Sequence, residues 1–290
     1  MDKVKEVVTL CNLNFRKWFS STRIKIILLL VVLLIYNNFS GVRLFAAAAN
    51  VNVTPWGLPF LLSNFNNLII IMFGYVFLYC NAPFIDEQKP YVILRSGRKI
   101  FSAAQILYIF VSSLIYAIFL AVATIVCSLP RVEFSPKWGK VFKTLAITSE
   151  GSQFNVALPV TEKITLNFTP IEAMVKQLLL LWLIGCFLGF LIFALNMHFP
   201  RFVGIGAASL FIFLDMFADF FRISHGYFSN RIYSFSPVSW ANLTIQKCNP
   251  AEMLPTFTYQ CTVLLMVITI LVFIILLSFR KEEIEVIPQI

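Results

Sequence analysis

Charged residues are scarce in this chain, and histidine is almost absent. Only 13% of its 290 residues are charged and two are histidine, whereas 59% are hydrophobic and 31 are phenylalanine. A water-soluble domain of this size needs a largely polar surface, so the composition excludes one. We therefore expect most of the chain to lie within a lipid bilayer.

Motifs for a bound nucleotide or metal ion are also missing. The pattern GxxxxGK[ST], whose backbone amides cradle nucleotide phosphates, does not occur. The six cysteines include no CxxC pair, and His198 and His225 fall on opposite sides of the predicted membrane. The sequence therefore predicts no enzyme activity, catalytic residue, metal site or cofactor in this chain. It leaves open a disulfide between Cys127 and Cys248, which both lie near the predicted outer face.

Six apolar runs are long enough to cross the bilayer as helices, because about 20 residues of helix span its hydrocarbon core of roughly 30 Å. They cover residues 24–44, 61–80, 103–127, 177–195, 202–221 and 261–279. The second is the weakest candidate, since Asn64, Asn66 and Asn67 interrupt its outer half. We expect an all-α polytopic membrane protein with six transmembrane helices in a single domain, residues 1–290.

Lysines and arginines gather on one side of these runs. They precede the first run, separate the second from the third and the fourth from the fifth, and follow the sixth. Positive residues in short loops stay on the cytoplasmic side, so both termini are predicted to be cytoplasmic. This asymmetry and contact with anionic lipid head groups account for the net charge of +9. Nucleic acid is not expected as a partner.

Amphipathic segments flank the runs. Residues 1–22 predict a helix in the inner membrane interface, because apolar residues recur there at offsets of three and four. The external loop 128–170 has the same spacing at Trp138, Val141, Phe142 and Leu145, which predicts a second interfacial helix on the outer leaflet. Alternation of Ile164, Leu166 and Phe168 then predicts a short extended piece. In the external segment 222–260 we expect broken or re-entrant helices.

The cytoplasmic segment 81–101 is unusual in its content. Its stretch YVILRSGRK holds three cations and a glycine. Gly97 suits the end of a short helix with Tyr91 and Leu94 on its apolar side and Arg95 and Arg98 as charged edges. A plain positively charged anchor is the alternative. We favour a helix that docks on a partner, because apolar residues below the membrane need a surface to cover them.

Charges within the runs are the other candidate site, since a charge in a membrane is costly and often functional. Asp215, Asp219 and Arg222 share one stripe of the fifth run, and Glu172 with Lys176 begins the fourth at a similar depth. A satisfied cluster of ion pairs is one interpretation. The other is that Asp215 lines a transport pathway or an outer gate. Separately, the GxxxG pattern of the fourth run predicts close helix packing.

Taken together, the layout resembles the permease subunits of type 2 ABC exporters. The resemblance rests on six runs with cytoplasmic termini, the interfacial helix before the first, the passage YVILRSGRKIFSAAQILYI, and SPVSW before the last. It implies that segment 81–101 carries a coupling helix that docks on a separate ATPase subunit. The outer loop after the third run is longer than in many members, which leaves the substrate class open.

The resemblance also implies an assembly. Two ATPase subunits would bind ATP and Mg, and a second permease, identical or homologous, would complete the complex in the cell membrane. The expected function is export of an amphipathic or hydrophobic substrate, such as a peptide, lipid or drug-like molecule. A self-sufficient channel or secondary transporter is the alternative, but it would more often show repeat symmetry, and no internal repeat is visible.

Overall fold

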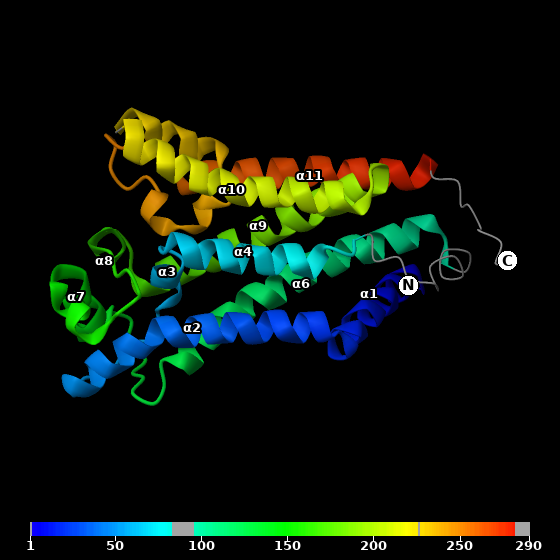
Figure 1. Ribbon diagram of the computed structural model, residues 1–290. Helices are drawn as coiled ribbons and strands as arrows, with labels where there is room; N and C mark the ends of the chain where they lie inside the picture. The colour runs from blue at the N-terminus through cyan, green and yellow to red at the C-terminus, as the bar shows by residue number, and fades with distance from the viewer. Residues whose placement is uncertain (1, 83–95, 226, 282–290) are drawn as a thin grey trace.

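The chain is an all-α, multi-pass membrane protein. The computed structural model describes residues 2–82, 96–225 and 227–281. Within them five helices are long and apolar enough to cross a membrane: α2 (Thr22–Ala48), α6 (Arg98–Cys127), α9 (Pro170–His198), α10 (Arg201–His225) and α11 (Phe257–Lys281). They run lengthwise beside one another (Figure 1). Extended pairing in the described part is limited to one bridge, Val53 to Val132.

Helix α9 is the centre of the bundle. It packs against α6, α10, α11 and the shorter α4 (Phe65–Tyr79). Gly185 and Gly189 allow the close approach that their spacing predicts, because a Cβ at Gly185 would meet Tyr75 and Ser113, and one at Gly189 would lie 2.8 Å from Ile109. The fourth apolar run is thus buried on nearly all sides, as expected of a helix that is apolar all round.

The second apolar run is a broken helix, not the continuous one expected over residues 61–80. A single turn, α3 (Leu58–Leu61), precedes α4, which at about 1.5 Å per residue is shorter than the bilayer core. Helix α4 begins at Phe65 because the Asn64 side chain accepts a 2.9 Å hydrogen bond from the Asn66 amide. Asn67 donates to Asn38 at 2.9 Å and accepts from it at 3.2 Å.

The predicted N-terminal helix is present as α1 (Asp2–Ser20), and it packs against α6. Two polar contacts join the helices: Asn14 Nδ2 donates to Gln105 Oε1 and the Trp18 indole donates to the Tyr108 hydroxyl, each at 2.8 Å. Val4 and Val8, which belong to the predicted apolar face, are exposed. The helix therefore contacts the bundle through its second half.

The loop between α6 and α9 contains α7 (Gly139–Ile147), the 3-10 segment η1 (Ser149–Phe154) and α8 (Glu162–Asn167). Helix α7 lies where its spacing predicts, but its apolar face is buried against the protein. The Phe60 ring of α3 lies 5.0 Å from the rings of both Trp138 and Phe142, and the Trp138 indole donates to the Phe168 carbonyl at 2.8 Å. An interfacial helix would turn this face toward lipid, whereas here α3 and α8 cover it; the position of α7 at the outer leaflet stays a prediction.

The extended piece predicted over Ile164, Leu166 and Phe168 is also wrong. These residues belong to α8 and its end. Ile164 and Phe168, four residues apart, are both buried on one side of the turn, while Leu166 is 77% exposed. Alternation over so few residues fits both periods, and burial of the i and i+4 pair selects the helix.

Within segment 222–260, where we expected broken or re-entrant helices, α10 continues to His225, α11 begins at Phe257, and short helical turns lie between the two helices. They comprise the 3-10 segments η2 (Tyr227–Phe235), η3 (Ser239–Ala241) and η4 (Leu243–Ile245). The buried Trp240 indole donates to the Tyr233 carbonyl at 2.6 Å, and the Gln177 side chain of α9 donates to the Ala241 carbonyl. Side-chain donors thus hold these turns on the bundle.

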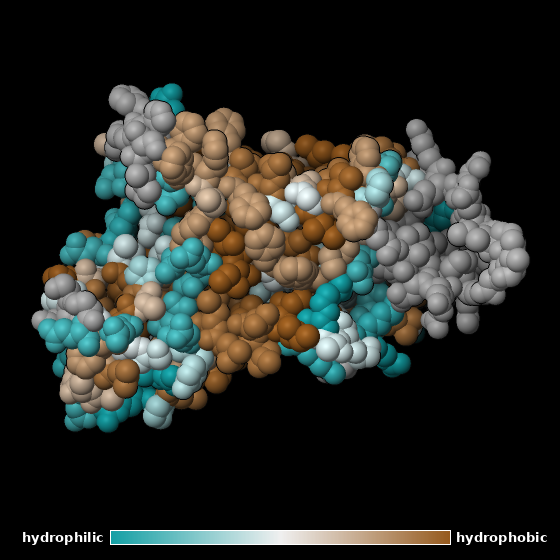
Figure 2. Space-filling view, in the orientation of Figure 1, coloured by the Kyte–Doolittle hydropathy of each residue, from teal (hydrophilic) through white to brown (hydrophobic). Residues whose placement is uncertain are grey.

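The two ends of the bundle differ. One end, here called the terminal end, contains the start of α1, the start of α6 and the end of α11 (Figure 1). The other end contains α7 and α8 and is called the α8 end. On the face shown in Figure 2, hydrophobic residues fill the middle and hydrophilic ones gather at the α8 end. Large exposed apolar side chains, such as Leu29 of α2, Phe213 of α10 and Met266 of α11, fit contact with lipid tails.

We predict that Gly185→Ala destabilises the protein. The added methyl group would press on the buried Ser113 and Tyr75 side chains, and overpacking of this kind costs about 1–3 kcal/mol. Gly206→Ala in α10 is the matched control, because its Cβ would meet nothing within 4 Å. Thermal unfolding of both variants in detergent measures the difference. Equal midpoints would show that α9 is not packed as closely as described.

Candidate functional site

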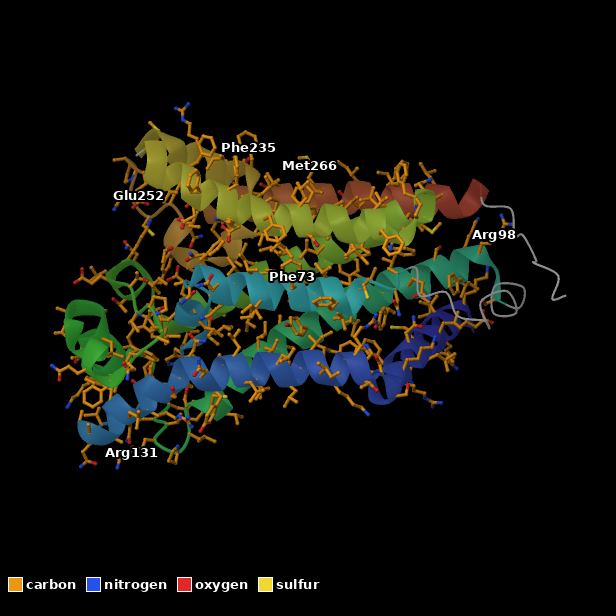
Figure 3. All side chains as sticks on the ribbon, viewed as in Figure 1. Phe73, Arg98, Arg131, Phe235, Glu252 and Met266 are labelled. Carbon is orange, nitrogen blue, oxygen red and sulfur yellow. The ribbon has the colours of Figure 1, made fainter. Side chains whose placement is uncertain are left out.

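A polar cavity of about 410 Å³ lies at the α8 end of the bundle. Its wall is built from the start of α4, from α8, α10 and η2, and from the turns that follow η2. The charged residues of the lining are Lys163, Asp215, Asp219 and Glu252. Figure 3 shows Glu252 at this end, far from Arg98 at the terminal end.

Asp215 is the most buried charged residue of the lining. It is 2% exposed, and its Oδ2 atom receives no hydrogen bond from any residue that the structure describes. Asp219 lies one turn further along α10 and accepts a 3.1 Å hydrogen bond from the Tyr233 hydroxyl. A buried carboxyl group without a partner is costly in a membrane-spanning helix, so Asp215 is the residue of the lining that most requires one.

Another part of the wall carries an ion pair between Lys163 of α8 and Glu252, with 3.0 Å between Nζ and Oε2. The same oxygen accepts the Cys248 amide at 2.9 Å. Partial burial alone would raise the pKa of Glu252, but the Cys248 amide and the Lys163 ammonium outweigh it, so the pKa is lowered. Lys163 is therefore engaged with Glu252 on its own side of the cavity.

The break before α4 forms another part of the wall, through Ser63 and Phe65. The carbonyl groups freed by the break find side-chain donors: Asn67 Nδ2 reaches the Leu61 carbonyl at 3.3 Å, and Asn242 Nδ2 reaches that of Ser63 at 3.5 Å. Non-helical backbone is tolerated at membrane depth where it is buried in protein or lines a cavity. The break thus supplies polar backbone beside the two aspartates.

The five charged residues that the sequence indicated as a candidate site do not all lie at the cavity. Asp215 and Asp219 line the cavity. Glu172 and Lys176 instead pair with each other along α9 at 2.7 Å, and the Lys176 ammonium lies over the rings of Phe168 and Phe257. The Arg222 side chain lies outside the described residues. The ion-pair interpretation thus fits Glu172 and Lys176, whereas Asp215 keeps an oxygen without a described partner.

Most of the predicted coupling segment, 81–101, lies outside the described residues. Tyr91, Leu94 and Arg95 lie outside the described residues, while Gly97 and Arg98 lie within them. Gly97 has φ 81° and ψ 154°, a conformation that suits glycine, and α6 begins directly after it at Arg98. Gly97 is thus the N-cap of α6, and the short helix that it was expected to end stays a prediction.

Sequence reasoning missed the residues that line the cavity together with the aspartates. These are Lys163, Tyr233 and Glu252. They lie far from Asp215 and Asp219 along the chain or in irregular segments, and no local spacing connects them to the aspartates. The six cysteines are free, so Cys127 and Cys248 are not paired. Among the described residues, no group of three or more His, Cys, Asp or Glu side chains is placed to hold a metal ion.

Comparison with known proteins adds no identification. The chain matches no protein-family model, no curated protein and no solved structure. The functional argument therefore rests on the arrangement of its own residues.

We predict that Glu252→Gln lowers stability at neutral pH but not in acid. A carboxyl group with a lowered pKa stabilises the folded state above its unfolded pKa of about 4.3, and this contribution is lost as the pH falls through the lower folded value. The difference from wild type should be on the order of 1 kcal/mol at pH 7. Thermal unfolding at pH values between about 3 and about 7 measures it. A difference that is constant across this range would rule out a role of the ionised form.

Proposed function

We propose that this chain is the membrane-spanning permease subunit of an ABC exporter, which moves an amphipathic or hydrophobic substrate out of the cell. The observation that carries the proposal is the position of α4. One end of this helix lines the polar cavity through Phe65 and Leu68, and the other, at Tyr79, leads into segment 81–101. A single stiff element thus joins the proposed ATPase-docking segment to the candidate substrate site.

The proposal includes six membrane crossings. The start of α1 and the end of α11 lie at the same end of the bundle, which supports an even number of passes (Figure 1). Among the described residues five helices are long and apolar enough to cross, and we propose the broken α3–α4 segment as the sixth crossing. We place the terminal end in the cytoplasm, because the lysines and arginines of the short connections gather there.

The contacts of α6 support a second route by which a movement of the docking segment would reach the bundle. Helix α6 begins at Arg98, immediately after that segment, and packs against both α1 and α9. The Asn14–Gln105 and Trp18–Tyr108 hydrogen bonds tie α1 to its first turns. A displacement of the segment would therefore act on α4 and on the α1–α6 pair together.

The assembly that follows from the proposal has four subunits in the cell membrane. Two copies of an ABC ATPase would bind ATP and Mg, and a second permease, identical or homologous, would pair with this one. The alternative is a self-sufficient channel or secondary transporter. Asp215 favours that alternative to some degree, because buried carboxylates in membrane helices also serve ion-coupled carriers.

The first test is whether ATP hydrolysis depends on a second polypeptide. We predict that the tagged chain, expressed with an ATPase that carries GxxxxGK[ST], purifies with it and that the complex hydrolyses ATP, whereas the chain alone does not. The phosphate-binding motif is missing from this sequence. Flux of an amphipathic substrate into liposomes that hold the chain alone, without nucleotide, would instead establish the channel or carrier.

The docking segment gives a second prediction. The double variant Tyr91→Ala and Leu94→Ala should weaken ATPase association more than tenfold, because loss of buried anchors at an interface typically costs about 2 kcal/mol or more. Arg98→Ala is the control and should act mildly, in a way that depends on salt. Binding of the purified ATPase to the chain in nanodiscs measures both. If the double variant binds the ATPase as tightly as the wild type does, the segment is only a positively charged anchor.

A further inference from the structure

The starting observation is the oxygen of Asp215 that no described residue bonds. Buried polar atoms in proteins nearly always form a hydrogen bond. Several side-chain atoms of the described residues are exceptions, but Asp215 Oδ2 is the one that belongs to a carboxyl group. This residue lines the cavity, so a group that enters the cavity is well placed to provide the missing partner.

The charges of the lining favour a positive partner. Among the described lining residues, Asp215, Asp219 and Glu252 are acidic and Lys163 is the basic one. Lys163 pairs with Glu252 at 3.0 Å. That ion pair leaves Asp215 as the buried carboxyl group of the lining with an oxygen that no described residue bonds, and low-dielectric walls strengthen its attraction for a cation.

The size and the walls of the cavity argue against a bare metal ion. Its volume of about 410 Å³ is many times the roughly 30 Å³ that one water molecule occupies. The described residues also provide no group of three metal-binding side chains. Phe65, Leu68 and Leu254 give the cavity apolar walls beside its carboxylates. This combination suits a cation attached to an apolar body.

We propose that the cavity binds an amphipathic amine, with its ammonium group at Asp215 and its apolar part against Phe65, Leu68 and Leu254. Asp219, held by the Tyr233 hydroxyl, lies one turn away on the same stripe. That such an amine is also the exported substrate rests on the proposed function. Binding itself requires neither the ATPase nor nucleotide.

The test uses hexylammonium as the probe and hexan-1-ol as its uncharged counterpart. The purified full chain in phosphatidylcholine nanodiscs is titrated by calorimetry, and the signal of empty nanodiscs is subtracted. We expect hexylammonium to bind the wild type at least tenfold more tightly than Asp215→Asn, and hexan-1-ol to bind both equally. Glu172→Gln is the matched control and should keep wild-type affinity, because Glu172 pairs with Lys176 and does not line the cavity.

A second variant protects the test if Asp215→Asn folds poorly. Leu254→Trp should fill part of the cavity without changing its charge, and it should weaken hexylammonium binding as well. Equal affinity of hexylammonium for the wild type and both variants would overturn the proposal. So would tight binding of sodium or calcium that Asp215→Asn abolishes while hexylammonium has no effect. Loss of ATPase association would leave these binding results unchanged, so the two proposals can fail separately.

Discussion

The hydrogen-bonded pair of Asn38 and Asn67 is the constraint on which the candidate site depends. A helix that breaks at membrane depth leaves carbonyl groups without donors, and hydrocarbon offers none. Here the Asn67 side chain donates hydrogen bonds to the Asn38 side chain and to the Leu61 carbonyl, while the Asn242 side chain donates to the Ser63 carbonyl. Because these donors are present, the chain can leave the helix between α3 and α4 and place Ser63 beside the α10 carboxylates.

The rest of α4 is held firmly, which matters for any movement that passes along it. Tyr79 donates to the Ile109 carbonyl at 3.2 Å, and the Tyr116 hydroxyl reaches the Ile71 carbonyl at 3.3 Å. Gly185 of α9 lets the Tyr75 ring lie against that helix. A helix fixed along its length by α6 and α9 moves as a unit, so a displacement at Tyr79 would be felt at Phe65.

The features that could be predicted from the sequence are those encoded by neighbouring residues. Hydropathy located the five long helices, Asn64 to Asn67 marked the weak point of the second run, and the i, i+4 spacing placed Asp215 with Asp219 on one stripe. Contacts between distant residues carry no such pattern: Lys163 and Glu252 are 89 positions apart and Asn242 and Ser63 are 179 apart. Helix α7 illustrates another limit, because spacing reveals an apolar face but not whether lipid or protein covers it.

Two pairs of charged residues with the same spacing show why Asp215 stands apart. Glu172 and Lys176 have opposite charges four residues apart, so each satisfies the other on the helix that carries both. Asp215 and Asp219 have the same spacing and the same charge, so neither can satisfy the other, and their repulsion destabilises α10 if both are ionised. The Tyr233 hydroxyl donates a hydrogen bond to Asp219, which offsets part of this destabilisation. The second oxygen of Asp215 has no such neighbour among the described residues, and this difference between the two pairs is the reason for proposing that a positive group enters the cavity.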